Sequence, residues 1–347
     1  MANDREIIEP DELAEVLKRY DLGAIEKIRE YPRGSRRSPK ILIDTTSGRY
    51  VLKRRAQGRD KPARVTFAHT VLWRLREKGI PVPDLLRTRD SRESMLIIHG
   101  RVYELFKYVP GDHYDASLAH TSQGGKTLAR IHRALRNFQT AWQPPAGGYH
   151  DSDRVRAGLN SIPSAVSSHD SVLGHESDLL ALIQELYESY ENATRAVNRL
   201  GFRGWESRII HGDWHPGNLR YRNDRVVAVL DFDAARRCPP VMDLANGMLQ
   251  FSIVRNAGDP ERWPDFFDQA RMRRFFAGYA DRIRLTRRQR QAVVYLMIES
   301  LIAECAAPVA ATGSLGQIPG YVVLQMARRK VRWLHTNKLH LERWILA

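Results

Sequence analysis

The residues best suited to chemistry lie in one short stretch, Ile209 to Asn218, which reads IIHGDWHPGN. An apolar run leads into a loop that carries the carboxylate of Asp213 and the carboxamide of Asn218. A second apolar run then leads to Asp231, in the sequence VLDFD. Phosphoryl transfer needs one carboxylate to take or orient a hydroxyl proton, and an amide oxygen and another carboxylate to hold Mg²⁺ on nucleotide phosphates. These residue types in this order are suited to that chemistry.

The segment between Asn218 and Asp231 must return the chain if the two side chains are to act together. Its pattern predicts a β-hairpin over 219–230 that turns at Asn223-Asp224 and places Asp231 at a strand end. A second interpretation of Asp213 and Asn218 is a loop that satisfies its own backbone. A zinc site made by His211 and His215 is disfavoured, because the Gly, Pro and Trp around them argue against a helix.

The wider pattern predicts an α+β fold. A mostly antiparallel sheet with an inserted helix is expected first, with helices over 11–20 and 63–78 and strands over 25–31, 40–44, 49–54, 94–98 and 102–108. Helices dominate the remainder, over 117–136, 177–200, 264–279, 287–306 and 321–344, while 143–175 is expected to be a long loop or lid. We therefore predict a small nucleotide-binding lobe, residues 1–108, and a larger helical lobe, residues 109–347, with the acceptor site.

The pattern H-G-D-x-H-x-x-N followed by D-F-D resembles the catalytic core of the aminoglycoside phosphotransferase and choline kinase family, which has a bilobal protein-kinase-like fold. The resemblance runs from about Ile25 to beyond Asp243. It implies that Asp213 is the catalytic base and that Asn218 and Asp231 are the metal ligands. It also implies supporting roles for three residues: His211 orders the loop, Asp233 contacts metal or supports the loop, and Asp243 ties the loop to the next helix.

The resemblance implies ATP and Mg²⁺ as cofactors. Lys53, in YVLK, matches the strand lysine that contacts the α- and β-phosphates. The segment 33–38 takes the place of the phosphate-covering loop but holds one glycine, so backbone amides and Ser35 or Ser38 would cap the phosphates. The segment 104–111 resembles the hinge whose backbone groups bind adenine, which implicates Lys107 and Val109.

One departure from the family pattern concerns the helix expected over 63–78. In the family this helix carries a Glu that pairs with the strand lysine, and by position it should lie near Ala68. The sequence there is TFAH, and no acid follows until Glu77. Either another carboxylate positions Lys53, or the correspondence shifts in this helix.

The charge bears on the acceptor. The 347 residues include 55 Lys and Arg against 40 Asp and Glu, a formal charge of +15. A protein this basic attracts a polycation poorly over long range, so a neutral or anionic hydroxyl compound is favoured. Glu299 and Glu304, in a C-terminal helix, are the candidate acceptor-site acids. The homoserine-kinase-like and stress-response-kinase-like branches share the same core.

Two other functions stay open. One is a Ser/Thr protein kinase of the same fold. The other is a pseudokinase-like module that binds nucleotide or, through the basic stretches 271–290 and 328–332, nucleic acid, although no nucleic-acid motif supports the latter. Two cysteines, a polar N-terminus and no long apolar run predict a cytoplasmic protein that does not insert into membranes.

Overall fold

The computed structural model describes residues 5–31, 37–166, 176–255 and 260–347. The chain divides into two compact units. Unit 1 comprises 1–113, 137–145 and 218–235, and unit 2 comprises 114–136, 146–217 and 236–347. Each unit is described by itself, and the domain boundary expected after residue 108 stays a prediction.

Unit 1 is built on a five-stranded antiparallel sheet with the strand order β1-β2-β3-β5-β4. The strands are β1 (Ile25–Glu30), β2 (Lys40–Thr45), β3 (Gly48–Arg54), β4 (Leu96–Ile98) and β5 (Arg101–Lys107). Two helices accompany the sheet, α1 (Pro10–Leu17) and α2 (Pro62–Glu77). The hairpin β7 (Leu219–Arg222) and β8 (Arg225–Val229) completes the unit.

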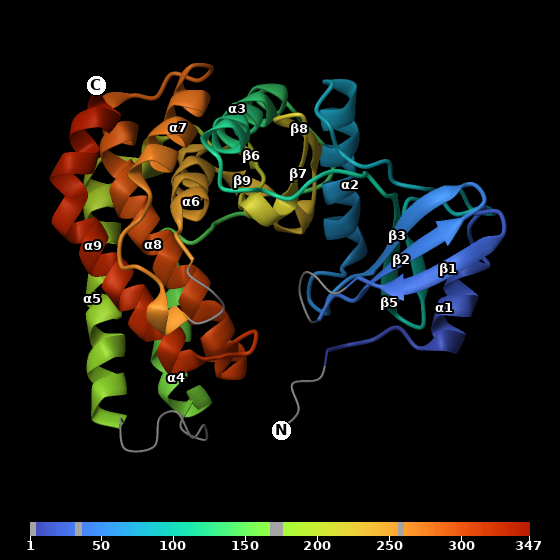
Figure 1. The fold of residues 1–347 in the computed structure, drawn as a ribbon, viewed down its shortest axis with the longest axis horizontal. Helices are drawn as coiled ribbons and strands as arrows, with labels where there is room; N and C mark the ends of the chain where they lie inside the picture. The colour runs from blue at the N-terminus through green and yellow to red at the C-terminus, as the bar shows by residue number, and fades with distance from the viewer. Residues whose placement is uncertain (1–4, 32–36, 167–175, 256–259) are drawn as a thin grey trace. The chain divides into compact units, whose positions relative to one another are not determined.

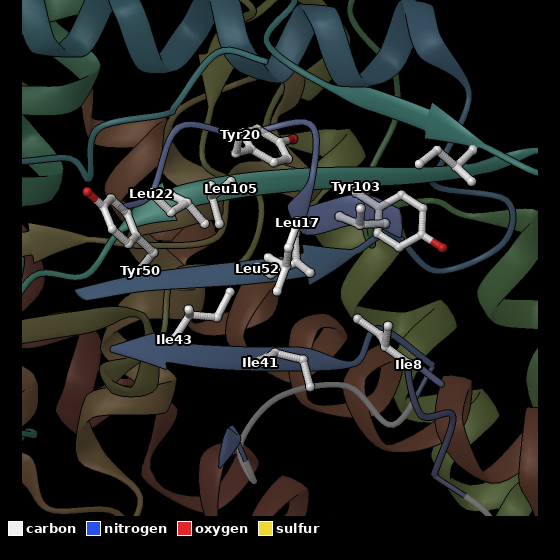
Figure 2. Close-up of a cluster of buried hydrophobic side chains, with 12 residues drawn as sticks. Ile8, Leu17, Tyr20, Leu22, Ile41, Ile43, Tyr50, Leu52, Tyr103 and Leu105 are labelled. Atoms are coloured by element: carbon white, nitrogen blue, oxygen red, sulfur yellow. The ribbon is translucent and has the colours of Figure 1, made fainter. Parts of the chain in front are cut away.

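The core of unit 1 forms because alternate strand residues face α1 and the chain that follows it. Ile41, Ile43, Leu52 and Leu105 come from the strands and are buried against Leu17 and its neighbours. Figure 2 shows this cluster, in which Tyr20 and Leu22 of the segment after α1 also take part. This core holds β3 and β5 side by side. The pairing places Lys53, which follows Leu52, opposite Glu104.

Unit 2 is helical. Its helices are α3 (Leu118–Ala134), α4 (Asp153–Val166), α5 (Glu176–Arg199), α6 (Val241–Ser252), α7 (Gln269–Ala280), α8 (Arg287–Thr312) and α9 (Gly320–Leu346). In Figure 1, α5, α8 and α9 lie side by side, and α3 packs on α7. Two short antiparallel pairs interrupt the helices, β6 (Arg208–Ile210) with β9 (Arg236–Cys238), and β10 (Ser314–Leu315) with β11 (Ile318–Pro319).

Helix α8 is long and apolar enough, by composition, to cross a membrane. However, 78% of its most apolar 18-residue window is buried inside the protein. A membrane helix would present such a surface to lipid, whereas a core helix covers it with neighbouring elements. The burial identifies α8 as the central helix of unit 2.

Three expectations about unit 2 need correction. Residues 143–175 are not one long loop, because α4 forms within them and buries Leu159 and Ile162; residues 167–175 lie outside the described residues. The helix expected from 264 begins at Gln269, because the side chain of Asp268 accepts a hydrogen bond from the Arg271 amide. The helix expected to end at 306 runs on to Thr312 despite Pro308.

Some of the basic C-terminal side chains have partners within unit 2. Arg332 on α9 donates to Glu185 on α5 at 2.6 Å, and Arg329 donates to Asp265 at 2.7 Å. These arginines connect α9 to other segments of the unit. Part of the positive charge therefore serves packing, while binding of nucleic acid by the basic stretches stays a prediction.

Candidate active site

The loop that carries Asp213 is anchored by Asp243 on α6. The Asp243 carboxylate accepts hydrogen bonds from the amides of His211, at 2.8 Å, and Gly212, at 2.9 Å. His132 on α3 lies 3.2 Å from the same carboxylate. Burial by itself would raise the pKa of Asp243, but these donors and the nearby histidines outweigh it and hold the pKa below its ordinary value. Asp243 is therefore an ionised anchor for the loop, in line with the supporting role inferred from the resemblance.

The Asp213 side chain is 47% exposed, and its carboxylate lies 3.7 Å from the His215 ring. Its own amide donates to Nδ1 of His211 at 3.3 Å, so His211 orders the loop rather than facing solvent. The neighbouring Trp214 is fully buried and anchors the loop in the interior. An ordered backbone with an accessible carboxylate is the arrangement that a general base requires.

The hairpin in unit 1 brings Asn218 next to the start of the Asp231 loop. The amide of Leu230 donates to the carbonyl oxygen of Asn218 at 2.8 Å. At the other end the chain turns at Asn223 and Asp224, both with positive φ, as a two-residue hairpin turn requires. The predicted hairpin is thus confirmed in this structure, with Asp231 just beyond its open end.

The carboxylates of Asp231 and Asp233 meet two lysines from the sheet. Nζ of Lys53, on β3, lies 2.6 Å from Oδ1 of Asp233 and 3.1 Å from Oδ1 of Asp231. Lys40, on β2, lies 3.4 Å from the other Asp231 oxygen. Burial would raise the pKa of Asp231, but Lys53 and Lys40 outweigh burial and hold it well below its ordinary value. Asp231 is therefore ionised at any physiological pH.

These residues suit a divalent cation with hard oxygen ligands. Asn218 offers an amide oxygen and Asp231 an ionised carboxylate, and their backbones are adjacent across the hairpin end. Asp231 also has φ +63°, a conformation uncommon for a residue with a side chain and frequent at functional loops. The described residues hold no group of three or more His, Cys, Asp and Glu that would bind a metal by themselves. Two protein ligands plus nucleotide phosphates are what Mg²⁺ commonly uses.

The predicted nucleotide contacts lie in unit 1. The amide of Lys107 already donates to the carbonyl of Asp84 at 2.8 Å, whereas Val109 follows β5 and makes no backbone hydrogen bond to any described residue. The binding of an adenine edge by Lys107 or Val109 stays a prediction. Ser35 lies outside the described residues, and the hydroxyl of the nearby Ser38 donates to the carbonyl of Arg54.

Sequence reasoning missed a set of buried charged residues beside Lys53. Arg55, His69 and Glu104 are at most 2% exposed, and Glu104 binds both of the others. The available signal was the pairing of β3 with β5, which places Glu104 opposite Lys53. In the sequence, Glu104 stands out only as part of the hinge segment, and His69 only as a position where an acid is expected.

The two acceptor-site candidates occupy different surroundings in unit 2. Glu299 is fully buried, where His150 lies 2.8 Å from its carboxylate and Thr194 donates to it. The Glu304 carboxyl is partly buried and accepts a hydrogen bond from the Gln250 side chain on α6. The negative charge of Asp213 also acts on it. Burial first, and then Asp213, raise the pKa of Glu304 to about 8. Of the two, Glu304 is the acid whose pKa the Asp213 charge raises.

A comparison with protein families matches residues 27–286 to the phosphotransferase enzyme family. The chain belongs to this family. This phosphotransferase is 26% identical over 294 residues to a homoserine kinase of a Caulobacter species, covering 83% of this chain and 82% of that one. It is also 26% identical over 240 residues to a homoserine kinase of a Bradyrhizobium species, covering 64% of this chain and 62%, less than two thirds, of the other.

Solved structures confirm the fold of this phosphotransferase. An aminoglycoside phosphotransferase from Alicyclobacillus acidocaldarius superposes with a TM-score of 0.68 at 19% identity and covers 99% of both chains. A microcompartment-associated aminopropanol kinase gives a TM-score of 0.72 at 14% identity, covering 96% of this chain and 99% of its own. The predicted α+β fold, with an N-terminal antiparallel sheet and a helical C-terminal part, is thereby confirmed, as is the predicted family.

Proposed function

We propose that this phosphotransferase moves the γ-phosphoryl group of ATP to the hydroxyl of a small amino alcohol or hydroxy amino acid. Asp213 accepts the hydroxyl proton as the hydroxyl oxygen bonds to the γ-phosphorus. The bond from that phosphorus to the bridging oxygen breaks, and ADP leaves. Lys53 binds the phosphates, and Asn218 and Asp231 hold Mg²⁺, which when bound neutralises phosphate charge. The observation that carries the proposal is the ordered loop that presents Asp213, together with the ionised Asp231 beside Asn218.

The acceptor class follows from the groups around Glu304. A partly buried carboxyl with a raised pKa gains most from an ammonium group, which would ionise it and pair with it. Arg255 lies close enough to interact with Glu304 and could pair with a carboxylate of the same acceptor. A zwitterion carries no net charge, so it is also compatible with a protein of charge +15. The homoserine kinases and the aminopropanol kinase among the similar proteins support this class.

Three acceptors that differ by one group test this proposal. Homoserine has both charges, 3-aminopropan-1-ol lacks the carboxylate, and 4-hydroxybutanoate lacks the amine. ADP release with Mg²⁺ should be fastest with homoserine. Glu304→Gln should reduce kcat/KM for the two amines and leave 4-hydroxybutanoate unchanged, whereas Arg255→Gln should reduce kcat/KM for the two carboxylates and leave 3-aminopropan-1-ol unchanged.

Asp213→Asn separates binding from chemistry. The variant should bind ATP as the wild type does and release ADP at least about 100-fold more slowly, because its amide cannot accept the hydroxyl proton. Wild-type ADP release that no acceptor stimulates would overturn the proposed function. Stimulation by a Ser/Thr peptide and by none of the three small acceptors would favour the protein kinase instead.

We also propose that the protein works in a reducing compartment that contains ATP, the cytoplasm. Both cysteines are free and buried, which suits such a compartment.

A further inference from the structure

Helix α2 lacks the acid that the family pattern places opposite the strand lysine. The buried side chain at that part of the helix is His69, and the first acid is Glu77, whose side chain is 67% exposed at the helix end. Lys53 is nevertheless 5% exposed and needs compensating negative charge. Asp233 and Asp231 supply that charge directly, at 2.6 and 3.1 Å. An acid that replaces the helix Glu must therefore act on this group of charges.

Glu104 on β5 is the buried acid nearest this lysine along the sheet. It is the cross-strand partner of Lys53, and its side chain is fully buried. Arg55 donates to both of its oxygens, at 2.5 and 2.8 Å, in a two-pronged pair. The His69 ring lies 2.6 Å from one of the same oxygens and is itself held by Ser94 at 2.8 Å. α2 thus contacts the carboxylate through an imidazole instead of supplying one.

The second terminal nitrogen of Arg55 forms an ion pair with Asp233, without hydrogen-bond geometry. It lies 2.8 Å from Oδ1 of Asp233, the oxygen that also meets Lys53 Nζ at 2.6 Å. A continuous chain of buried charges therefore runs from Glu104 through Arg55 to Asp233 and Lys53. Asp233 is two residues from Asp231, so the same chain fixes the segment that carries the predicted metal ligand.

We infer that Glu104 is the positioning residue that takes over the role of the helix acid, and that it acts through Arg55. Glu104 holds the guanidinium, the guanidinium holds Asp233, and Asp233 sets the place of Lys53 Nζ and of the Asp231 loop. The rigid fork of Arg can serve two carboxylates at fixed geometry, which a lysine could not do. The inference rests on the proposed function in that Lys53 is taken as the phosphate-binding lysine.

The test relocates the carboxylate. Glu104→Gln removes the negative charge of the carboxylate. The double variant, Glu104→Gln with His69→Glu, restores a carboxylate at the neighbouring position on α2, where the imidazole contacts Glu104 in the wild type. For each variant, the Kd for ATP is measured by equilibrium titration, first in EDTA and then in Mg²⁺. The melting temperature of the same protein is measured as a check on folding. Glu191→Gln is the matched control, because Glu191 is a partly buried glutamate of unit 2 that pairs with an arginine, Arg156, at 2.7 Å.

Glu104→Gln should weaken ATP binding about tenfold or more, with and without Mg²⁺, since loss of a charged hydrogen-bond partner has effects of this size. The double variant should recover affinity to within about threefold of the wild type. Glu191→Gln should melt earlier than wild type and keep the wild-type Kd for ATP.

Folded Glu104→Gln protein with the wild-type Kd would overturn the inference. So would a double variant that recovers the melting temperature but not the affinity, because that result would make Glu104 a structural residue only. The readout is nucleotide affinity alone. Wild-type protein that binds ATP but phosphorylates no acceptor would therefore overturn the proposed function while leaving this result standing, and wild-type protein that binds no ATP would overturn both.

Discussion

Glu304→Gln should make the protein more stable, and increasingly so as the pH rises. Folding raises the pKa of Glu304 from 4.5 to about 8. Above pH 4.5 the unfolded chain loses a proton that the folded protein keeps, so wild-type stability falls by about 1.4 kcal/mol for each pH unit up to about 8. The whole interval corresponds to about 4 to 5 kcal/mol. Since Glu304 is partly exposed, solvent screens it, and we expect a gain of about 2 kcal/mol at pH 8.

Urea unfolding monitored by tryptophan fluorescence at pH 5, 6, 7 and 8 measures this effect. The difference between variant and wild type should be near zero at pH 5 and grow steadily to pH 8, because other titrating groups cancel. Glu188→Gln, on the exposed face of α5, is the matched control and should differ from wild type by less than about 0.5 kcal/mol throughout. A Glu304→Gln difference that is independent of pH, or that falls with pH, would refute the reasoning.

Three further outcomes are expected from urea unfolding. Asp243→Asn should cost about 2 to 4 kcal/mol, because the His211 and Gly212 amides donate to different carboxylate oxygens and an asparagine keeps only one of these acceptors; an unchanged midpoint would contradict this. Burial lowers the pKa of Lys330 to about 8, so the stability of wild type relative to Lys330→Met should rise from pH 8 to pH 10; a flat difference would argue against a buried ammonium. Asn223→Ala should cost about 1 kcal/mol, since alanine tolerates positive φ poorly; no loss would mean the turn rearranges.

The sequence was most informative where local chemistry determines structure. The turn at Asn223-Asp224 and the apolar strands beside it predict the hairpin, because turn residues with positive φ and alternating strands are local signals. The spacing of Asp213, Asn218 and Asp231 then predicts the candidate site, although its residue roles stay predictions. Helix α4 was missed because Gly158 and Pro163 weaken the helical signal, while the burial of Leu159 and Ile162 against other helices stabilises it.

The sequence KRR at 53–55 shows why the ion pairs of the site could not be predicted from the sequence. Lys53 binds Asp233, Arg54 binds Glu12, and Arg55 binds Glu104. The three basic residues are alike in the sequence, and their partners lie between 42 and 180 positions away. Only the tertiary fold decides which acid each one meets, and therefore that Glu104 stands where a helix acid was expected.

The hydrogen bond from the Leu230 amide to the Asn218 carbonyl lies at the open end of the hairpin, and the turn lies at the other end. The separation of Asn218 and Asp231 is therefore set by the last cross-strand pair and not by the length of the strands. Tyr221 on β7 is also fixed, because it is fully buried and exchanges two backbone hydrogen bonds with Asp112. Only the exposed residues 222–225 beyond it can therefore be lengthened without moving that pair, and this tip offers an attachment point for a reporter or an added recognition element.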